Sequence, residues 1–409
     1  MNMSKSVQLI FLIIFSLLAT SCVEEYEFQS EVENFESILV VEATITNQDK
    51  FQEIKLSRSY NLDTIAPFPE RNAVVKVISD AQGTISFSEA SEGLYISNTP
   101  FTAQPNTTYV LDIQTNDGRS YTSSTEQLTT STQIDNLYAE RGFTDDNQEG
   151  MFIYVDSHDP SSSSNYYRYE YEETFKVVAP KYSPFEIVFE PGSFFDYTIE
   201  LRPEQQETCY RTQLSSSIIL ANTTSLGEDK VEKFPSRFIN RNEYIISHRY
   251  SILLRQYVIS REAYVFYDVL KRTTEQDGSL LTDTQPGFIE GNVFSTVNSN
   301  EKVLGYFQVS SVDEKRIFFD YEDYFPGEDL PPYIVGCGLL SPALAGNALG
   351  NDIPSHPLYD HIQEGYQFFH TNDGTIDVFP SEGPEILVNP ECGDCTELGQ
   401  NTPPVFWED

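Results

Sequence analysis

The fold class is decided by the stretch YVLDIQTNDGRSY, residues 109–121. A β-rich run from Tyr109 to Ile113 is followed by Asn116-Asp117-Gly118, and a second β-rich run begins at Tyr121. An Asp-Gly pair between two such runs is a strong signal for a β-hairpin. The stretch therefore predicts two antiparallel strands joined by a tight turn.

Further short β-rich runs precede this hairpin, at residues 38–45, 54–57, 73–78 and 84–88. A cluster of turn residues, 79–83, separates the last two. Short strands with turn signals about every 8 to 12 residues are typical of a β-sandwich. We therefore predict an immunoglobulin-like or transthyretin-like β-sandwich over residues 36–130, with a junction near residues 129–132.

Residues 131–409 are predicted to form a larger β-rich domain. Within it, Tyr167, Tyr169 and Tyr171 alternate with charged residues, which gives a strand one aromatic face and one charged face. A half-buried sheet face is the interpretation that we favour. The alternative is an aromatic platform that binds a ligand, and it makes the three tyrosines candidate ligand-site residues.

One or two short helices are expected in this second domain. Ser260 is suited to cap a helix, and Glu262 lies in its first turn, where a negative charge is favourable. An apolar stripe at helical spacing follows, formed by Ala263, Phe266, Tyr267 and Leu270. Residues 245–258 predict another strand, whereas the chain from the acidic segment 320–324 onward is predicted to be rich in loops.

Four cysteines remain beyond Cys22: Cys209, Cys337, Cys392 and Cys395. An even number in an exported chain suggests two disulfides, and four cysteines allow three connectivities. We favour links from the first two to the Cys392/Cys395 pair, which would hold the tail against the body. A zinc site and a redox C-x-x-C are the alternatives, but only one C-x-x-C is present and no βαβ pattern surrounds it.

The N-terminus predicts export. Lys5 precedes a short apolar core at residues 9–18, and Ala19-Thr20-Ser21 leads to Cys22. This pattern indicates a signal peptide over residues 1–21, with cleavage and lipidation at Cys22. Residues 22–35 then form an acidic tether that resembles the signal for surface exposure. We expect a lipid anchor in the outer membrane, facing the exterior; the alternatives are an ordinary signal peptide with an incidental cysteine and a plain acidic linker.

The charge excludes one class of partner. The formal net charge is −38, and it becomes −39 without residues 1–21, whose one charged side chain is Lys5. So negative a chain repels phosphate backbones. We therefore expect no nucleic-acid partner.

No motif indicates catalysis or a cofactor. The sequence lacks a P-loop, an H-E-x-x-H and a G-x-S-x-G. His356, Asp360, His361 and His370 lie near one another but match no metal template, and residues 145–150 predict a hairpin loop rather than a calcium site. We expect no catalytic residue, no metal ligand and no cofactor.

Several blocks together resemble a known family. They are YSILLRQY (250–257), AYVFY (263–267), Pro286, GNV (291–293), GYF (305–307), KRI (315–317), CGDC (392–395) and PVFW (404–407), beside Cys22 and LVVE (39–42). In these blocks the chain resembles the Bacteroidota lipoproteins that carry the domain of unknown function DUF4249. A basic residue often follows the C-x-x-C in that family, whereas Thr396 stands here.

The resemblance implies an outer-membrane lipoprotein encoded beside a TonB-dependent receptor, with no established reaction. We therefore expect a non-catalytic accessory or ligand-binding partner of a TonB-dependent transporter. One alternative is a structural or assembly component of the envelope. Another is a surface hydrolase of glycan or peptide, which needs a cleft with paired carboxylates or a histidine cluster.

Overall fold

The computed structural model describes residues 37–59, 68–274, 289–347, 354–379 and 381–408. The predicted signal peptide, Cys22 and the acidic tether lie outside these residues. The described chain is mainly β, as the sequence predicts. No helix within it is long and apolar enough to span a membrane.

The first core is enclosed by short strands of the N-terminal region. These are β1 (Leu39–Thr46), β2 (Glu53–Arg58), β3 (Phe68–Pro69), β4 (Val74–Ser79), β5 (Gly83–Ser91), β6 (Leu94–Ser97), β7 (Thr108–Gln114), β8 (Ser120–Ser123) and β9 (Glu126–Gln127). Alternate residues point inward, so that Val41, Ile54, Val77 and Leu111 are all buried in one cluster. The predicted hairpin is confirmed, because β7 pairs with β8 and Gly118 adopts the positive φ (86°) that its turn requires.

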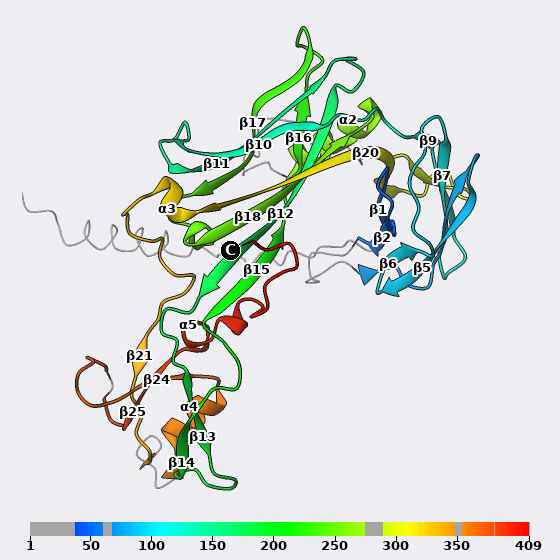
Figure 1. Ribbon diagram of the computed structural model, residues 1–409. Coiled ribbons are helices and arrows are strands. Elements are labelled where there is room, and N and C mark those ends of the chain that lie inside the picture. The colour runs from blue at the N-terminus through cyan, green and yellow to red at the C-terminus, as the bar shows by residue number, and fades with distance from the viewer. Residues whose placement is uncertain (1–36, 60–67, 275–288, 348–353, 380, 409) are drawn as a thin grey trace, which may run out of the picture. The chain divides into compact units, whose positions relative to one another are not determined.

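Two later strands complete this core. They are β19 (Val293–Ser295) and the first half of β20 (Val303–Asp320), which contribute Val293, Val303 and Phe307. Strand β1 pairs in parallel with β20 along its whole length (Figure 1). The region around this core, called the first sandwich below, therefore includes residues well beyond the predicted boundary at 130, because parallel pairing needs a long crossover that sequence periodicity does not reveal.

A second core lies between two sheets. One is the three-stranded sheet of β10 (Ile134–Phe143), β11 (Glu149–Asp159) and β17 (Asp229–Asn240). The other continues from β20 through β18 (Arg249–Val258) and β12 (Tyr166–Val178) to β15 (Thr208–Leu214), with β16 (Ile219–Asn222) also on β12. Together with the first region this gives one sheet in the order β15-β12-β18-β20-β1-β2-β6-β5-β4-β7-β8-β19.

The predicted helix is α2 (Arg261–Thr274), and Ser260 Oγ accepts a hydrogen bond from the backbone N–H of Ala263 at 3.1 Å. Its inner face, Ala263 and Phe266, packs against Tyr306 and Val312 of β20. Strand β18 begins at Arg249, because Tyr244–Ile246 forms a 3₁₀ turn before it.

The tail contains more helix than predicted. The segment expected to be loop forms α3 (Tyr321–Tyr324), since the Asp323 carboxylate accepts the Asp320 backbone N–H at 3.0 Å. Further short helices are α4 (Pro357–Gln363), α5 (Pro390–Gly393) and the 3₁₀ turn Cys395–Glu397.

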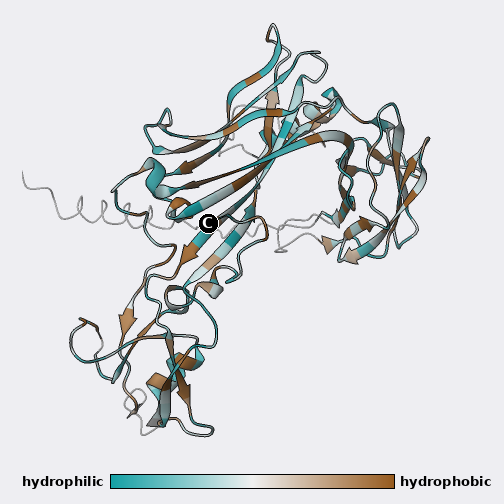
Figure 2. Ribbon diagram, in the orientation of Figure 1, coloured by the Kyte–Doolittle hydropathy of each residue, from teal (hydrophilic) through white to brown (hydrophobic). Residues whose placement is uncertain are grey.

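A hairpin from the middle of the chain and part of this tail together form what we call the stapled module. It consists of β13 (Phe185–Phe189), β14 (Tyr197–Leu201), β21 (Leu339–Leu340), β22 (Gly346–Asn347), β23 (Pro354–Ser355), α4, β24 (Gln367–Thr371) and β25 (Glu385–Val388). Its small core contains Ile187, Leu358, Phe368 and Leu387. Figure 2 shows apolar segments gathered around α4 in this part.

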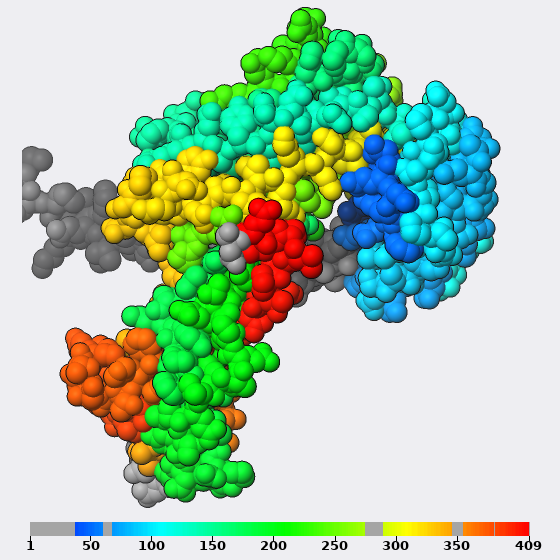
Figure 3. Space-filling view, viewed as in Figure 1, coloured from blue at the N-terminus to red at the C-terminus, as the bar shows by residue number. Residues whose placement is uncertain are grey.

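Two disulfides hold the tail. Each links one of the first two cysteines to the Cys392/Cys395 pair, as predicted. Cys209 on β15 bonds Cys395, and Cys337 bonds Cys392. The four thiols are therefore not zinc ligands. In Figure 3 the C-terminal residues, in red, lie against the green of β15, where Trp407 contacts Tyr210 edge to face.

Candidate functional site

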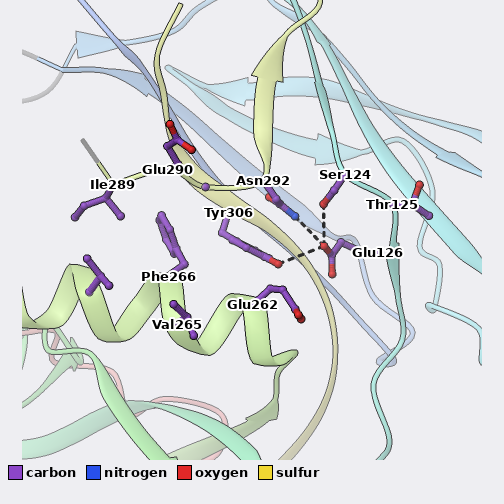
Figure 4. Close-up of a pocket in the computed structure, with 12 residues that line it drawn as sticks. Ser124, Thr125, Glu126, Glu262, Val265, Phe266, Ile289, Glu290, Asn292 and Tyr306 are labelled. Atoms are coloured by element: carbon purple, nitrogen blue, oxygen red, sulfur yellow. Dashed lines mark hydrogen bonds between the residues drawn. The ribbon is translucent and has the colours of Figure 1, made fainter. Parts of the chain in front are cut away.

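A cavity of about 680 Å³ opens beside helix α2 (Figure 4). Four segments that are distant in sequence line it: the chain around β9, helix α2, the residues before β19, and β20. The lining residues are Ser124, Thr125, Glu126, Glu262, Val265, Phe266, Val269, Ile289, Glu290, Gly291, Asn292 and Tyr306.

Two glycines allow these segments to meet. A Cβ on Gly291 would lie 1.6 Å from the carbonyl oxygen of Gly305, and a Cβ on Gly305 would lie 2.0 Å from the carbonyl oxygen of Val41. Gly305 also has φ +127°, which side chains rarely adopt. The backbone before β19 can therefore rest directly on β20, and β20 on β1, only because both positions are glycine.

Glu126 is the polar centre of the cavity. Its Oε1 accepts hydrogen bonds from Ser124 Oγ at 3.1 Å, Asn292 Nδ2 at 2.9 Å and Tyr306 Oη at 3.4 Å. Asn292 is itself fixed to β20, because its Oδ1 accepts the Phe307 backbone N–H at 2.7 Å and its Nδ2 donates to the Phe307 carbonyl at 2.7 Å. The carboxylate is thus held by neutral donors on a rigid backbone. Figure 4 shows its second oxygen on the side of Glu262.

Burial dominates the electrostatics of this carboxylate. It raises the pKa of Glu126, and the hydrogen bonds from Asn292, Ser124 and Tyr306 oppose that shift only in part. The neighbouring charge of Glu262 raises the pKa further. Burial likewise raises the pKa of Tyr306 to about 12, so its phenol stays protonated and donates to Glu126.

The opposite wall is apolar. Phe266 and Tyr306 are buried at its base, with ring centroids 5.5 Å apart. Val265 on the outer face of α2 is 51% exposed although it lines the cavity, and Ile289 lies across from the helix in Figure 4. A cavity with an apolar wall and a few fixed polar groups is typical of a small-molecule site.

The tyrosines proposed as a ligand platform are not available to a ligand. Tyr167, Tyr169 and Tyr171 lie in the second core, covered by the sheet of β10, β11 and β17. Tyr167 Oη donates to Asp229 Oδ2 at 3.0 Å, and Tyr169 Oη donates to Gln256 Oε1 at 3.1 Å. The ligand-platform alternative is therefore wrong. The interpretation as a packed sheet face is confirmed, and this face is fully buried rather than half-buried.

The histidine region of the tail forms part of the stapled module. The His356 ring packs between Phe194 and Phe195, and His361 Nδ1 lies 2.7 Å from the carbonyl oxygen of Pro357. The described residues contain no group of three His, Cys, Asp or Glu side chains placed to hold a metal ion. Residues 144–148 form the turn between β10 and β11, as predicted.

Sequence reasoning missed Glu126, because nothing distinguishes it among 63 acidic residues. One signal was present. Three of the blocks that carry the family resemblance line the cavity: AYVFY through Val265 and Phe266, GNV through Gly291 and Asn292, and GYF through Tyr306. These blocks are far apart in sequence but recur together in the family. That recurrence could have indicated that the three segments meet at one site.

Comparisons with known proteins place the chain in a family without giving it an activity. No curated protein matches. A DUF4785 family protein of Legionella pneumophila is 10% identical with a TM-score of 0.17, too low to support any inference, and the match covers 53% of this chain and about half (51%) of that one. The sequence model of the family named domain of unknown function DUF4249 matches residues 24–316. The chain therefore belongs to the DUF4249 family.

Proposed function

We propose that the protein is a surface-exposed outer-membrane lipoprotein that serves as a non-catalytic, ligand-binding accessory of a TonB-dependent transporter. The observation that carries the binding role is the cavity, which places a fixed carboxylate opposite an apolar wall. The described lining residues include no histidine, cysteine or lysine. The signal-peptide pattern that ends at Cys22 supports the anchor.

The transporter partnership is tested by co-purification. A C-terminally tagged protein is expressed in its native host, the outer membrane is solubilised gently, and the co-purifying proteins are identified. A TonB-dependent barrel in stoichiometric amount is the expected result. Recovery of the lipoprotein alone would contradict the partnership.

A matched variant separates anchoring from complex formation. Cys22→Ser should abolish labelling by radioactive palmitate and release the protein from the membrane fraction. Labelling that persists in this variant would show that Cys22 is not the lipidated residue.

A surface glycan hydrolase is a second candidate, favoured by one observation. The cavity holds more than one carboxylate, and burial raises the pKa of Glu126, as a general acid requires. Chromogenic glycosides of several classes test it directly. Turnover by the parent protein that is lost in Glu126→Gln would favour the enzyme over the binding accessory.

A further inference from the structure

We infer that the cavity bounded by Glu126, Phe266 and Tyr306 takes an amphipathic organic cation, an ammonium or guanidinium group carried on an apolar stem. This inference names the ligand class of the binding function proposed above and rests on it.

The charge of the cavity is unbalanced. Glu126, Glu262 and Glu290 line it, and the described lining residues include no lysine, arginine or histidine. The groups that face Glu126 are the neutral Ser124 and Asn292 beside it, the protonated phenol of Tyr306 on β20, and the carboxylate of Glu262 on α2. A bound cation would supply the missing countercharge, whereas an anion would be repelled.

Elsewhere three glutamates pair with arginine, whereas buried Asp159 and Asp229 are held by hydroxyl and backbone donors. Buried Glu70 pairs with Arg58, buried Glu173 lies 3.2 Å from Arg237 Nε, and Glu301 accepts a hydrogen bond from Arg119 Nη1 at 2.9 Å. Glu385 of the stapled module is another buried glutamate; it accepts the Tyr197 hydroxyl at 3.0 Å and interacts electrostatically with His370. Glu385 does not line this cavity, whereas Glu126 lies on its wall.

The apolar wall selects the rest of the ligand. Phe266, Val265, Val269 and Ile289 form a surface for a hydrocarbon stem. The ring of Tyr306, which reaches Glu126 through its hydroxyl, and the neighbouring ring of Phe266 both line the cavity. Aromatic faces beside a carboxylate favour an ammonium or guanidinium group.

A metal ion fits the cavity less well. The three glutamates are not among any group of described side chains placed to converge on one ion. A volume of about 680 Å³ is instead in the range of small-molecule sites, roughly 300–1,000 Å³. An organic cation can span the distance between the carboxylate and the helix, which a bare ion cannot.

The test is calorimetric titration of the full-length, detergent-solubilised lipoprotein with hexylammonium and hexylguanidinium. Hexan-1-ol, hexanoate and calcium chloride serve as neutral, anionic and metal probes. Binding of both cations at least about tenfold tighter than hexan-1-ol, weakening as salt is raised, is expected. Equal binding of hexan-1-ol, or tighter binding of calcium, would overturn the inference.

Variants locate the site. Glu126→Gln keeps the shape of the side chain and should weaken hexylammonium binding about tenfold, whereas Glu385→Gln, a matched loss of another buried carboxylate, should leave it unchanged. Val265→Asn, at an exposed position of α2, should weaken binding by shortening the apolar wall. Equal affinity in Glu126→Gln and the parent would refute the assignment of this cavity.

The pH dependence has a defined sign. A cation favours the ionised carboxylate, so affinity should rise as pH increases through the raised pKa of Glu126, and binding should release protons below that pKa. Affinity that is flat with pH in the parent, although Glu126→Gln abolishes binding, would contradict the direct ion pair.

A last arm distinguishes sources of the cation. Hexylammonium represents a free amine, and the blocked tripeptide acetyl-Leu-Lys-Leu-amide represents a peptide side chain; the tighter binder identifies the source. Failure of both cations while a TonB-dependent barrel still co-purifies would reject this ligand class and leave the transporter partnership standing. Binding of the cations without a co-purifying barrel would support the ligand class and contradict the transporter partnership.

Discussion

The first sandwich and the stapled module solve the problem of stability in different ways. Among the described residues, the core of the first sandwich contains 20 buried apolar side chains, whereas that of the module contains four. The module also leaves Phe185, Ile199 and Leu201 exposed, along one face of its hairpin. A core so small needs covalent staples, and disulfides provide them here.

The two regions also differ in how closely their backbone is packed and in how much apolar surface they expose. In the first sandwich the backbone is packed so tightly that two positions must be glycine, and the cavity lies at that crossing. In the module the apolar residues that do not reach the core form a surface of the kind that contacts other molecules. We therefore expect substitutions in the two regions to have different consequences.

The largest effect is expected at the crossing of β1 and β20. Gly305→Val places a side chain against the Val41 carbonyl at a positive φ, and should cost more than about 3 kcal/mol of unfolding free energy. Urea denaturation measures the loss. The control is Gly336→Ala in the tail, where an added Cβ meets no atom within 4 Å, and equal stability of the two variants would contradict this account.

Removing a staple should come next. Cys337→Ser with Cys392→Ser opens a loop of 55 residues in sequence separation, which should cost about 2–4 kcal/mol. The loss should be local, so limited proteolysis is expected to cut the stapled module while residues 68–123 remain intact. Simultaneous cleavage of both regions would show that the module supports the first sandwich.

A smaller effect of opposite sign is expected at Glu126. Burial raises the folded-state pKa of this carboxyl above its unfolded value, so ionisation opposes folding and stability falls as pH rises between the two pKa values. Glu126→Gln should therefore be more stable than the parent at pH 7.5, by less than about 1 kcal/mol, and the gain should disappear at pH 4. Thermal unfolding at both pH values measures it, and a variant less stable at pH 7.5 would contradict the desolvation argument.

The smallest effect on stability belongs to the exposed surface of the module. Leu201 is 70% exposed, so Leu201→Ser should change the unfolding free energy by less than about 0.5 kcal/mol. Urea denaturation tests this, with Leu358→Ala as the buried counterpart in the same module, expected to cost about 2–5 kcal/mol. A large loss in Leu201→Ser would mean that the Leu201 side chain is packed rather than free.

Local patterns in the sequence predicted the local structure well. The Asp117-Gly118 turn, the cap of Ser260 and the apolar stripe of α2 depend on neighbouring residues, and each is where the sequence placed it. The same reasoning gave the inward face of Tyr167, Tyr169 and Tyr171. It did not reveal that a second sheet covers that face, because a period of two defines faces but not what packs on them.

The candidate site depends on contacts between segments that are far apart in sequence. Glu126, Phe266, Asn292 and Tyr306 are brought together by the return of β19 and β20 to the first sandwich. Crossovers of this kind leave no periodic signature in the sequence. Gly291 and Gly305, which permit the crossing, cannot be told apart from ordinary loop glycines by sequence pattern. The sequence predicted that disulfides link the tail to the body, because four cysteines in an exported chain allow only three connectivities.

The central claim is that a ligand enters the cavity at α2 rather than the apolar surface of the stapled module. Hydrogen–deuterium exchange of the full-length lipoprotein, with and without hexylammonium, tests it in one experiment. The account predicts slower exchange in residues 124–127, 261–274, 289–295 and 303–309. Protection confined to residues 185–201 and 367–371, where Phe185 and Phe369 line a second pocket, would contradict it.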